Sequence, residues 1–272
     1  MRHGAPRLED FGRGYSRRVR YQEFRSRPEL SELVACTWER QVPADGRPDT
    51  TRVLPDGCVD LVWHPRGLIV AGPDRKPVMS QLSAGATVVG LRLRPGAAGV
   101  VLGLPASELR DTRVPLEEVW GSGGVELAER LAAAGTASEQ RELLELALLD
   151  RLASLEALDE LVIAASRTLG RPHVRIGSLA DALGTSERQL LRRFDSAVGY
   201  GPKTLDRVLR FQRFLWYARG LAAGEDDLAR TAADIGYADQ AHLTRECVRL
   251  SGLTPTELIA SYTEPARLAP LR

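Results

Sequence analysis

The sequence predicts an α+β fold of two domains, with a β-rich N-terminal domain that has flanking helices and an all-helical C-terminal domain. Three observations support this prediction. Short β-branched runs alternate with Pro and Gly turns in the first hundred residues, apolar residues then recur at helical spacing, and one sequence pattern occurs twice near the C-terminus. We expect the boundary after residue 158, which gives domains 1–158 and 159–272.

Length and composition are those of a globular protein. The chain has 272 residues, of which 43% are hydrophobic and 27% charged, enough for two domains with separate cores. No apolar run approaches the ~18 residues of a membrane span, and the Arg-rich segment 1–27 lacks the apolar stretch of a secretory signal. We therefore expect a cytoplasmic protein with no membrane partner.

The alternation of apolar residues with other residues supports the prediction of a β-rich domain. Val59, Leu61 and Trp63 occupy every second position of one run, and turns at 55–57 and 65–67 bound it. Leu91 and Leu93 alternate in a later run. Helices are then expected at 95–103, 115–120, 125–135 and 138–155.

Two features of this half have both a functional and a structural interpretation. One is a set of three tryptophans, for which an effector pocket and an ordinary core are the two interpretations: Trp38, Trp63 and Trp120. The expected helix 138–155 carries more leucines than one stripe requires, which makes it a candidate for a homodimer contact, with packing on its own domain as the alternative.

The three cysteines predict no disulfide or zinc framework, because Cys36, Cys58 and Cys247 are odd in number and include no CxxC pair. Cys58 and His64 fall on one face of an expected strand, which leaves a cysteine-based redox or metal sensor as an alternative function. A single strand supplies too few converging ligands for a metal. We predict no metal, no cofactor, no catalytic residue and no enzymatic activity.

The C-terminal pattern aligns position by position. With Ser186 and Asp239 as zero, both copies have Leu, Arg, Gly and Pro at the same later positions. Each copy therefore predicts a capped helix that a glycine ends, followed by a proline that begins the next helix. The matching pairs are Leu190 and Leu243, Arg192 and Arg245, Gly199 and Gly252, and Pro202 and Pro255.

A shorter helix precedes each copy, so the chain contains two helix-turn-helix units in tandem. In the first unit, Ser178 is expected to cap the shorter helix, and Gly184 to end it. Ser186 then caps the second helix, with Gln189 completing a capping box. The inward stripes are expected to be Leu190 and Phe194 in one unit and Leu243 and Cys247 in the other.

Charge is concentrated around the first unit. Residues 186–219 contain eight basic and three acidic residues, a net charge of +5 in a chain whose total is only +1. Such a segment attracts polyanions, including nucleic acid, although a solvated helix face gives the same count.

The segments "LADALGTSERQLLRRF" and "AADIGYADQAHLTREC…SGLTP" resemble the DNA-binding domain of the AraC/XylS family of bacterial transcription regulators. The resemblance implies two recognition helices at the ends of a long helix, expected over Pro202 to Arg219. Each recognition helix would enter one of two successive major-groove segments of double-stranded DNA. A nucleoid-associated protein that binds DNA without sequence preference is the other alternative.

The same resemblance assigns DNA-contacting residues. Arginine suits guanine, glutamine suits adenine, and leucine or alanine suits the thymine methyl group. Arg193 and Arg210 are expected to contact phosphates. The predicted set is Arg188, Gln189, Leu191, Arg192, Arg193 and Arg210, together with Gln240, Ala241, Thr244 and Arg245.

The second unit departs from the family pattern. Leu243 and Cys247 stand where the family generally has phenylalanines, so we expect a smaller second core. The acidic run Glu225 to Asp227 is expected to weaken DNA attraction there. We therefore expect the first unit to bind more tightly.

The N-terminal segments "LPDGCVDLVW" and "LRLRPGAAGVVLGLPASEL" resemble a domain that recurs in such regulators. In many of them this half is a cupin-like barrel with helices that dimerise. The resemblance implies a small-molecule effector, a second copy of the chain and RNA polymerase as candidate partners.

Overall fold

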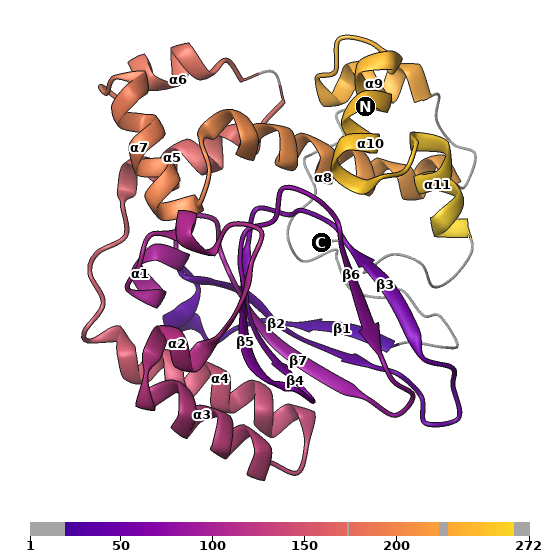
Figure 1. Ribbon diagram of the computed structural model, residues 1–272. Helices are drawn as coiled ribbons and strands as arrows, with labels where there is room; N and C mark the ends of the chain where they lie inside the picture. Colours follow the sequence, from indigo (N-terminus) through magenta and orange to yellow (C-terminus); the bar gives the residue numbers. More distant parts are fainter. Residues whose placement is uncertain (1–19, 173, 223–227, 264–272) are drawn as a thin grey trace.

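The computed structural model describes residues 20–172, 174–222 and 228–263, and Figure 1 shows a β-rich part beside a helical part. The acidic run Glu225 to Asp227 lies outside the described residues. None of the helices in the described segments has the length and apolar composition of a membrane span. The strands are β1 (Arg20–Phe24), β2 (Val34–Gln41), β3 (Asp49–Val53), β4 (Val59–His64), β5 (Gly67–Ala71), β6 (Val78–Leu82), β7 (Thr87–Leu93) and β8 (Arg113–Pro115).

The strands form a six-stranded antiparallel sheet in the order β1-β2-β7-β4-β5-β8 and a two-stranded ribbon of β3 and β6. The predicted alternation is confirmed, because Leu61 pairs with Leu91 and Val70 in adjacent strands and all three are fully buried. Successive side chains of a strand point to opposite faces. These leucines and valines therefore define one apolar face of the sheet.

Helices cover that apolar face (Figure 1). Leu144 and Leu148 of the long helix α4 are fully buried in this core, and a capping box between Thr136 and Glu139 starts the helix. Leu143 and other leucines of α4 pack partly buried against the same core, so the apolar surface that suggested a homodimer contact is used largely within the domain. The helices of this part are η2 (Pro28–Leu30), α1 (Ala98–Leu102), η3 (Ala106–Leu109), α2 (Leu116–Trp120), α3 (Ser122–Ala133) and α4 (Ala137–Leu152).

The β3–β6 ribbon packs against the opposite face of the sheet. Leu82 of β6 shares a buried cluster with Cys36 and Trp38 of β2. Arg40 of β2 binds Asp49 of β3. The six-stranded sheet therefore separates a helix-covered core from a second, smaller cluster beneath the ribbon.

The helical part contains two cores that share the long helix α8. The first core includes Phe194 and Leu205, and the second includes Phe211 and Phe214. Each core belongs to one helix-turn-helix unit, which we call the first unit (α6 and α7) and the second unit (α9 and α10). The helices are α5 (Glu160–Leu169), α6 (Ile176–Ala182), α7 (Glu187–Val198), α8 (Pro202–Ala222), α9 (Leu228–Ile235), α10 (Gln240–Ser251) and α11 (Pro255–Thr263).

Two local expectations need correction. Ser178 does not cap the first short helix, because α6 begins at Ile176 and Ser178 lies inside its first turn. The connecting helix also extends to Ala222 rather than ending at Arg219.

Candidate nucleic-acid interface

Helix α7 has the local structure that its sequence predicts. The backbone N–H of Gln189 donates to Ser186 Oγ at 3.3 Å, and the backbone N–H of Ser186 donates to Gln189 Oε1 at 3.2 Å. Gly199 ends the helix with φ of +92°, a conformation that favours glycine. Leu190 and Phe194 are fully buried, which fixes the opposite face of α7 toward solvent.

The outward face of α7 presents Arg188, Leu191 and Arg192, all exposed. Neither arginine forms an ion pair with another residue of the described chain. Leu191 has 54% of its surface exposed and lies over the backbone of Gly201, where an added Cβ would be 2.5 Å from Leu191 Cδ1. The face therefore combines two unpaired cations with one exposed apolar side chain.

Helix α10 repeats this design. The carboxylate of Asp239 caps it by accepting the backbone N–H of His242 at 2.6 Å, and Gly252 ends it with φ of +72°. Leu243 and Cys247 are fully buried. Gln240, Ala241 and Arg245 are exposed on the outward side, beside the partly buried Thr244.

Arg192 and Arg245 occupy the same position of the repeat, six residues after the capping residue. Each is exposed, each forms no ion pair with a described residue, and each stands on a helix whose inner face is fully buried. A guanidinium in this state can donate two hydrogen bonds to an external acceptor pair, such as the O6 and N7 atoms of guanine.

Four members of the predicted set have side chains that are engaged within the protein. Thr244 donates from Oγ1 to the backbone carbonyl of Gln240 at 2.9 Å. Gln189 Oε1 accepts the capping hydrogen bond described above. Arg193 Nη1 lies 2.9 Å from Asp159 Oδ2, and Arg210 binds Asp206 with its guanidinium 5.5 Å from the ring centroid of Tyr237. Arg193 and Arg210 therefore have anionic partners within the protein, and their phosphate contacts stay predictions.

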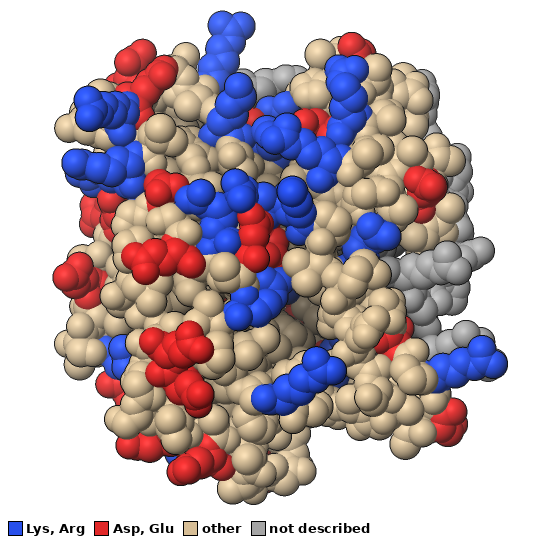
Figure 2. Space-filling model, viewed as in Figure 1, with Lys and Arg blue, Asp and Glu red and all other residues tan. Residues whose placement is uncertain are grey.

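Counting charges from the sequence overstates the cationic surface of α7 and α8. Besides Arg193 and Arg210, Arg207 is paired, with its Nε atom 2.7 Å from Glu246 Oε2 of α10. Arg188, Arg192 and Lys203 remain exposed without an ion pair in the described chain. Figure 2 shows Lys and Arg gathered over the upper part of one face, where Figure 1 places the helical part.

Sequence reasoning missed two residues of the second unit. Val248 and Arg249 lie one turn beyond Thr244 and Arg245, and both are exposed, Val248 by 46%. Their spacing of three and four residues continues the outward stripe, so helical periodicity alone could have identified them. They extend the unpaired cationic and apolar surface of α10 by one turn.

Burial raises the pKa of two ionisable groups in the helical part, Asp206 and Cys247. Burial raises the pKa of Asp206, and this effect outweighs the lowering by Arg210 and Arg213. Burial, with a smaller contribution from Glu246, holds the pKa of the Cys247 thiol well above its usual value. Cys247 is therefore a protonated core side chain at neutral pH and no nucleophile.

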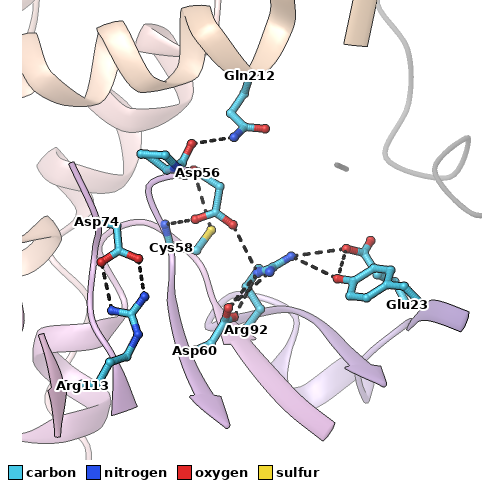
Figure 3. A network of polar contacts seen from close by, with 10 residues as sticks. Glu23, Asp56, Cys58, Asp60, Asp74, Arg92, Arg113 and Gln212 are labelled. Carbon is cyan, nitrogen blue, oxygen red and sulfur yellow. Dashed lines mark hydrogen bonds and ion pairs between the residues drawn. The ribbon is translucent and has the colours of Figure 1, made fainter. Parts of the chain in front are cut away.

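A buried network of ion pairs around Arg92 lies close to Cys58, one of the two residues that suggested a sensor (Figure 3). Figure 3 shows Arg92 surrounded by acidic side chains, with its Nε atom 2.9 Å from Asp60 and 3.3 Å from Asp56. Burial alone would lower the pKa of Arg92, but Asp60, Tyr21 and Asp56 raise it, and the balance lies well above the usual value. Arg92 therefore stays charged in the buried network.

Cys58 and His64 do not form a metal site with these groups. The backbone N–H of Cys58 donates to Asp56 Oδ1 at 2.9 Å, while burial and Arg66 lower the pKa of His64. Among the described residues, no group of three or more His, Cys, Asp and Glu side chains is arranged to hold a metal ion. The sensor alternative has no support in this geometry.

The three tryptophans do not line one pocket. Trp38 stacks on Tyr21 beneath the ribbon, and its ring lies so close to Gly90 that an added Cβ would be 2.3 Å away. Trp63 packs against the core on the other face of the sheet. Trp120 packs against that core as well, under the guanidinium of Arg151.

Comparison with known families gives two matches. Residues 22–115 match a family described as a domain of unknown function (DUF6597), and residues 179–261 match a helix-turn-helix domain family. No curated protein matches the chain. The second match spans the two units and the connecting helix whose geometry is described above.

Solved structures similar to the chain include ToxT from Vibrio cholerae O395, with 12% identity, coverage of 92% of this chain and 100% of that chain, and a TM-score of 0.39. Another is unsaturated fatty acid bound wild-type ToxT from Vibrio cholerae strain SCE256, with 11% identity, coverage of 91% and 96%, and a TM-score of 0.36. These TM-scores indicate only a weak likeness, whereas the family match over residues 179–261 and the two helix-turn-helix units identify the DNA-binding domain. The chain is a DNA-binding transcription regulator with an AraC-type helix-turn-helix domain and an N-terminal DUF6597 domain.

Proposed function

We propose that this regulator reads a specific sequence of double-stranded DNA, with α7 and α10 entering two successive major-groove segments. The observation that carries the proposal is the equivalence of Arg192 and Arg245, which are exposed and unpaired on two helices with fully buried inner faces. Helix α8 has 21 residues and is about 31 Å long, close to the ~34 Å between successive major-groove segments on one face of DNA.

The outward residues divide by chemistry. Arg188, Arg192 and Arg245 suit guanine, and Gln240 suits adenine. Leu191, Ala241 and Val248 supply apolar contacts for thymine methyl groups. Lys203 and Arg249 are exposed cations at the edges of the two helices, and we assign them to phosphates.

Selection from random DNA tests this function. The full chain should enrich a site with two conserved blocks about one helical turn apart, and footprinting should protect both blocks on one face. Equal affinity for the enriched site and for unrelated DNA would instead identify a nucleoid-type protein without sequence preference. Arg130→Ala on α3 is a matched control, because it removes one exposed charge far from α7 and α10.

A further inference from the structure

Two arginines of the N-terminal part bind the ends of the two recognition helices. Arg110, which follows η3, donates from Nε to the backbone carbonyl of Gly199 and from Nη2 to Asp195 Oδ1, the latter at 2.6 Å. Arg52 of β3 donates from Nη1 to the backbone carbonyl of Ser251. Each contact falls at the C-terminal end of its recognition helix.

In both contacts a guanidinium donates to a backbone carbonyl at a helix end, and Arg110 adds an ion pair with Asp195. The last carbonyl groups of a helix lack partners within the helix, and the helix dipole makes this end negative. A guanidinium therefore satisfies free acceptors and interacts favourably with the dipole. The two carbonyls lie one position apart in the repeat, since Gly199 corresponds to Gly252 and Ser251 directly precedes Gly252.

Both contacts depend on close approach of the backbone. A Cβ at Gly199 would lie 2.5 Å from Pro73 Cγ and 2.9 Å from the carbonyl oxygen of Ala106, both in the N-terminal part. A Cβ at Gly252 would lie 2.9 Å from Arg52 Nη1. Because these two glycines lack a side chain, the N-terminal part can pack closely against the ends of the recognition helices.

A third contact lies between the other two. Gln212 of α8 donates from Nε2 to the backbone carbonyl of Pro55 at 2.6 Å, as Figure 3 shows. Leu54 is buried in the second core, and a Cβ at Gly57 would lie 2.9 Å from Leu205 Cδ1 of the first core. The N-terminal part therefore touches both units and the helix that joins them.

We propose that Arg52 and Arg110 are positioning residues that brace the two recognition helices at a fixed separation and thereby set the spacing between the DNA blocks that the protein accepts. The two units have separate hydrophobic cores and are joined through α8. An N-terminal part that binds the end of each recognition helix restricts the movement of the two units relative to each other. This inference rests on the proposed reading of two DNA segments.

The first test changes the spacing of the DNA site. The site enriched by the wild-type chain is altered by one base pair inserted or removed between its two blocks. Wild type should lose affinity by about tenfold or more, the scale of a mismatched contact. The variant Arg52→Gln/Arg110→Gln should lose about threefold or less on the same altered sites, because its units adjust to them. Arg66→Gln/Arg130→Gln is the control, with equal charge change at exposed positions of the N-terminal part.

The second test needs no DNA. Spin labels at Ala182→Cys on α6 and Ala233→Cys on α9, both exposed, report the distance between the units. The distribution should be narrow in the otherwise wild-type chain and should broaden in the Arg52→Gln/Arg110→Gln background. Single Arg52→Gln and Arg110→Gln variants provide the same comparison if the double variant fails to fold.

The outcomes separate the brace from the proposed function. Unchanged distance distributions together with an unchanged spacing penalty would overturn the brace. Failure of the wild-type chain to enrich any site would overturn sequence-specific reading, while the spin-label distances would still test the brace.

Discussion

The carboxylate of Asp159 connects two helices: Oδ1 accepts the backbone N–H of Leu161 at 3.1 Å to cap α5, and Oδ2 lies 2.9 Å from Arg193 Nη1 of α7. One side chain therefore starts the first helix of the helical part and holds its first recognition helix. The arginine is partly exposed, so the pair contributes little to stability by itself. Its main consequence is that the Arg193 guanidinium already has an anionic partner.

Internal pairing predicts a weak effect of Arg193 and Arg210 on DNA binding. Removing a phosphate contact lowers the slope of log affinity against log salt by about 0.9. We expect such a change for Lys203→Ala and Arg249→Ala, and a clearly smaller one for Arg193→Ala and Arg210→Ala. Binding isotherms at several salt concentrations measure the slopes. A full reduction of the slope for Arg193→Ala would support the assignment of this residue to a phosphate contact.

Arg192 and Arg245 should behave as base-reading residues. Replacing either by alanine should cost on the order of 1–3 kcal/mol on the selected site and relax preference at particular base pairs. Lysine should rescue only in part, because it lacks the planar donor fork. Anisotropy titrations against the selected site and its single-base variants test this, and equal losses on all DNA would contradict it.

The expected difference between the two units makes a prediction about their equivalent arginines. The sequence predicts that Arg192→Ala costs more binding free energy than Arg245→Ala, because the first unit lies in the segment of net charge +5. The second unit has Cys247 in its core and the acidic run Glu225 to Asp227 beside it. The second core also contains Phe211 and Phe214 of α8, and the relative size of the two cores stays a prediction of the sequence. Comparing the affinities of the two variants for the selected site tests this ranking.

The complete burial of Cys247 makes a prediction about a larger side chain at this position. Phenylalanine there should overpack the core and lower the free energy of unfolding by about 1–3 kcal/mol. Urea unfolding followed by circular dichroism measures the change. Val248→Phe is the matched control, because its position is exposed and should tolerate the ring. A stabilised Cys247→Phe variant would show that the core has unfilled space.

A fragment beginning at Asp159 should fold and bind DNA. It keeps the cap of α5, both units and α8, and it loses Leu54 from the second core and the contacts of Arg52 and Arg110. We expect native-like helical content with lower stability than the same helices have in the full chain. Circular dichroism and urea unfolding test this, and a soluble but unfolded fragment would place the domain boundary elsewhere.

The features predicted correctly from sequence are the local ones. Capping at Ser186 and Asp239 depends on groups within three residues, and the ends at Gly199 and Gly252 depend on one backbone conformation. The pairing of Arg193 with Asp159 joins residues 34 positions apart. No periodicity in the sequence encodes such a pair, so charge counting took Arg193 to be free.

Ser178 shows the limit of local reasoning as well. Its residue type suits a cap, but α6 begins earlier, after Arg175, which provides no side-chain cap. Leu179 and Ala180 of this helix are buried in the first core. Tertiary packing of this kind can override the preference of a serine for the N-cap position. The effector, RNA polymerase and homodimer partners stay predictions of the sequence.

Leu54 belongs to a strand-rich domain by sequence but to the second helix-turn-helix core by packing. A chimaera that fused this N-terminal half to the DNA-binding half of another regulator would leave Leu54 without its apolar neighbours, and the reciprocal chimaera would leave a hole in the second core. Exchange of halves during evolution would therefore select for a compensating residue at this position. The two halves are expected to be inherited together.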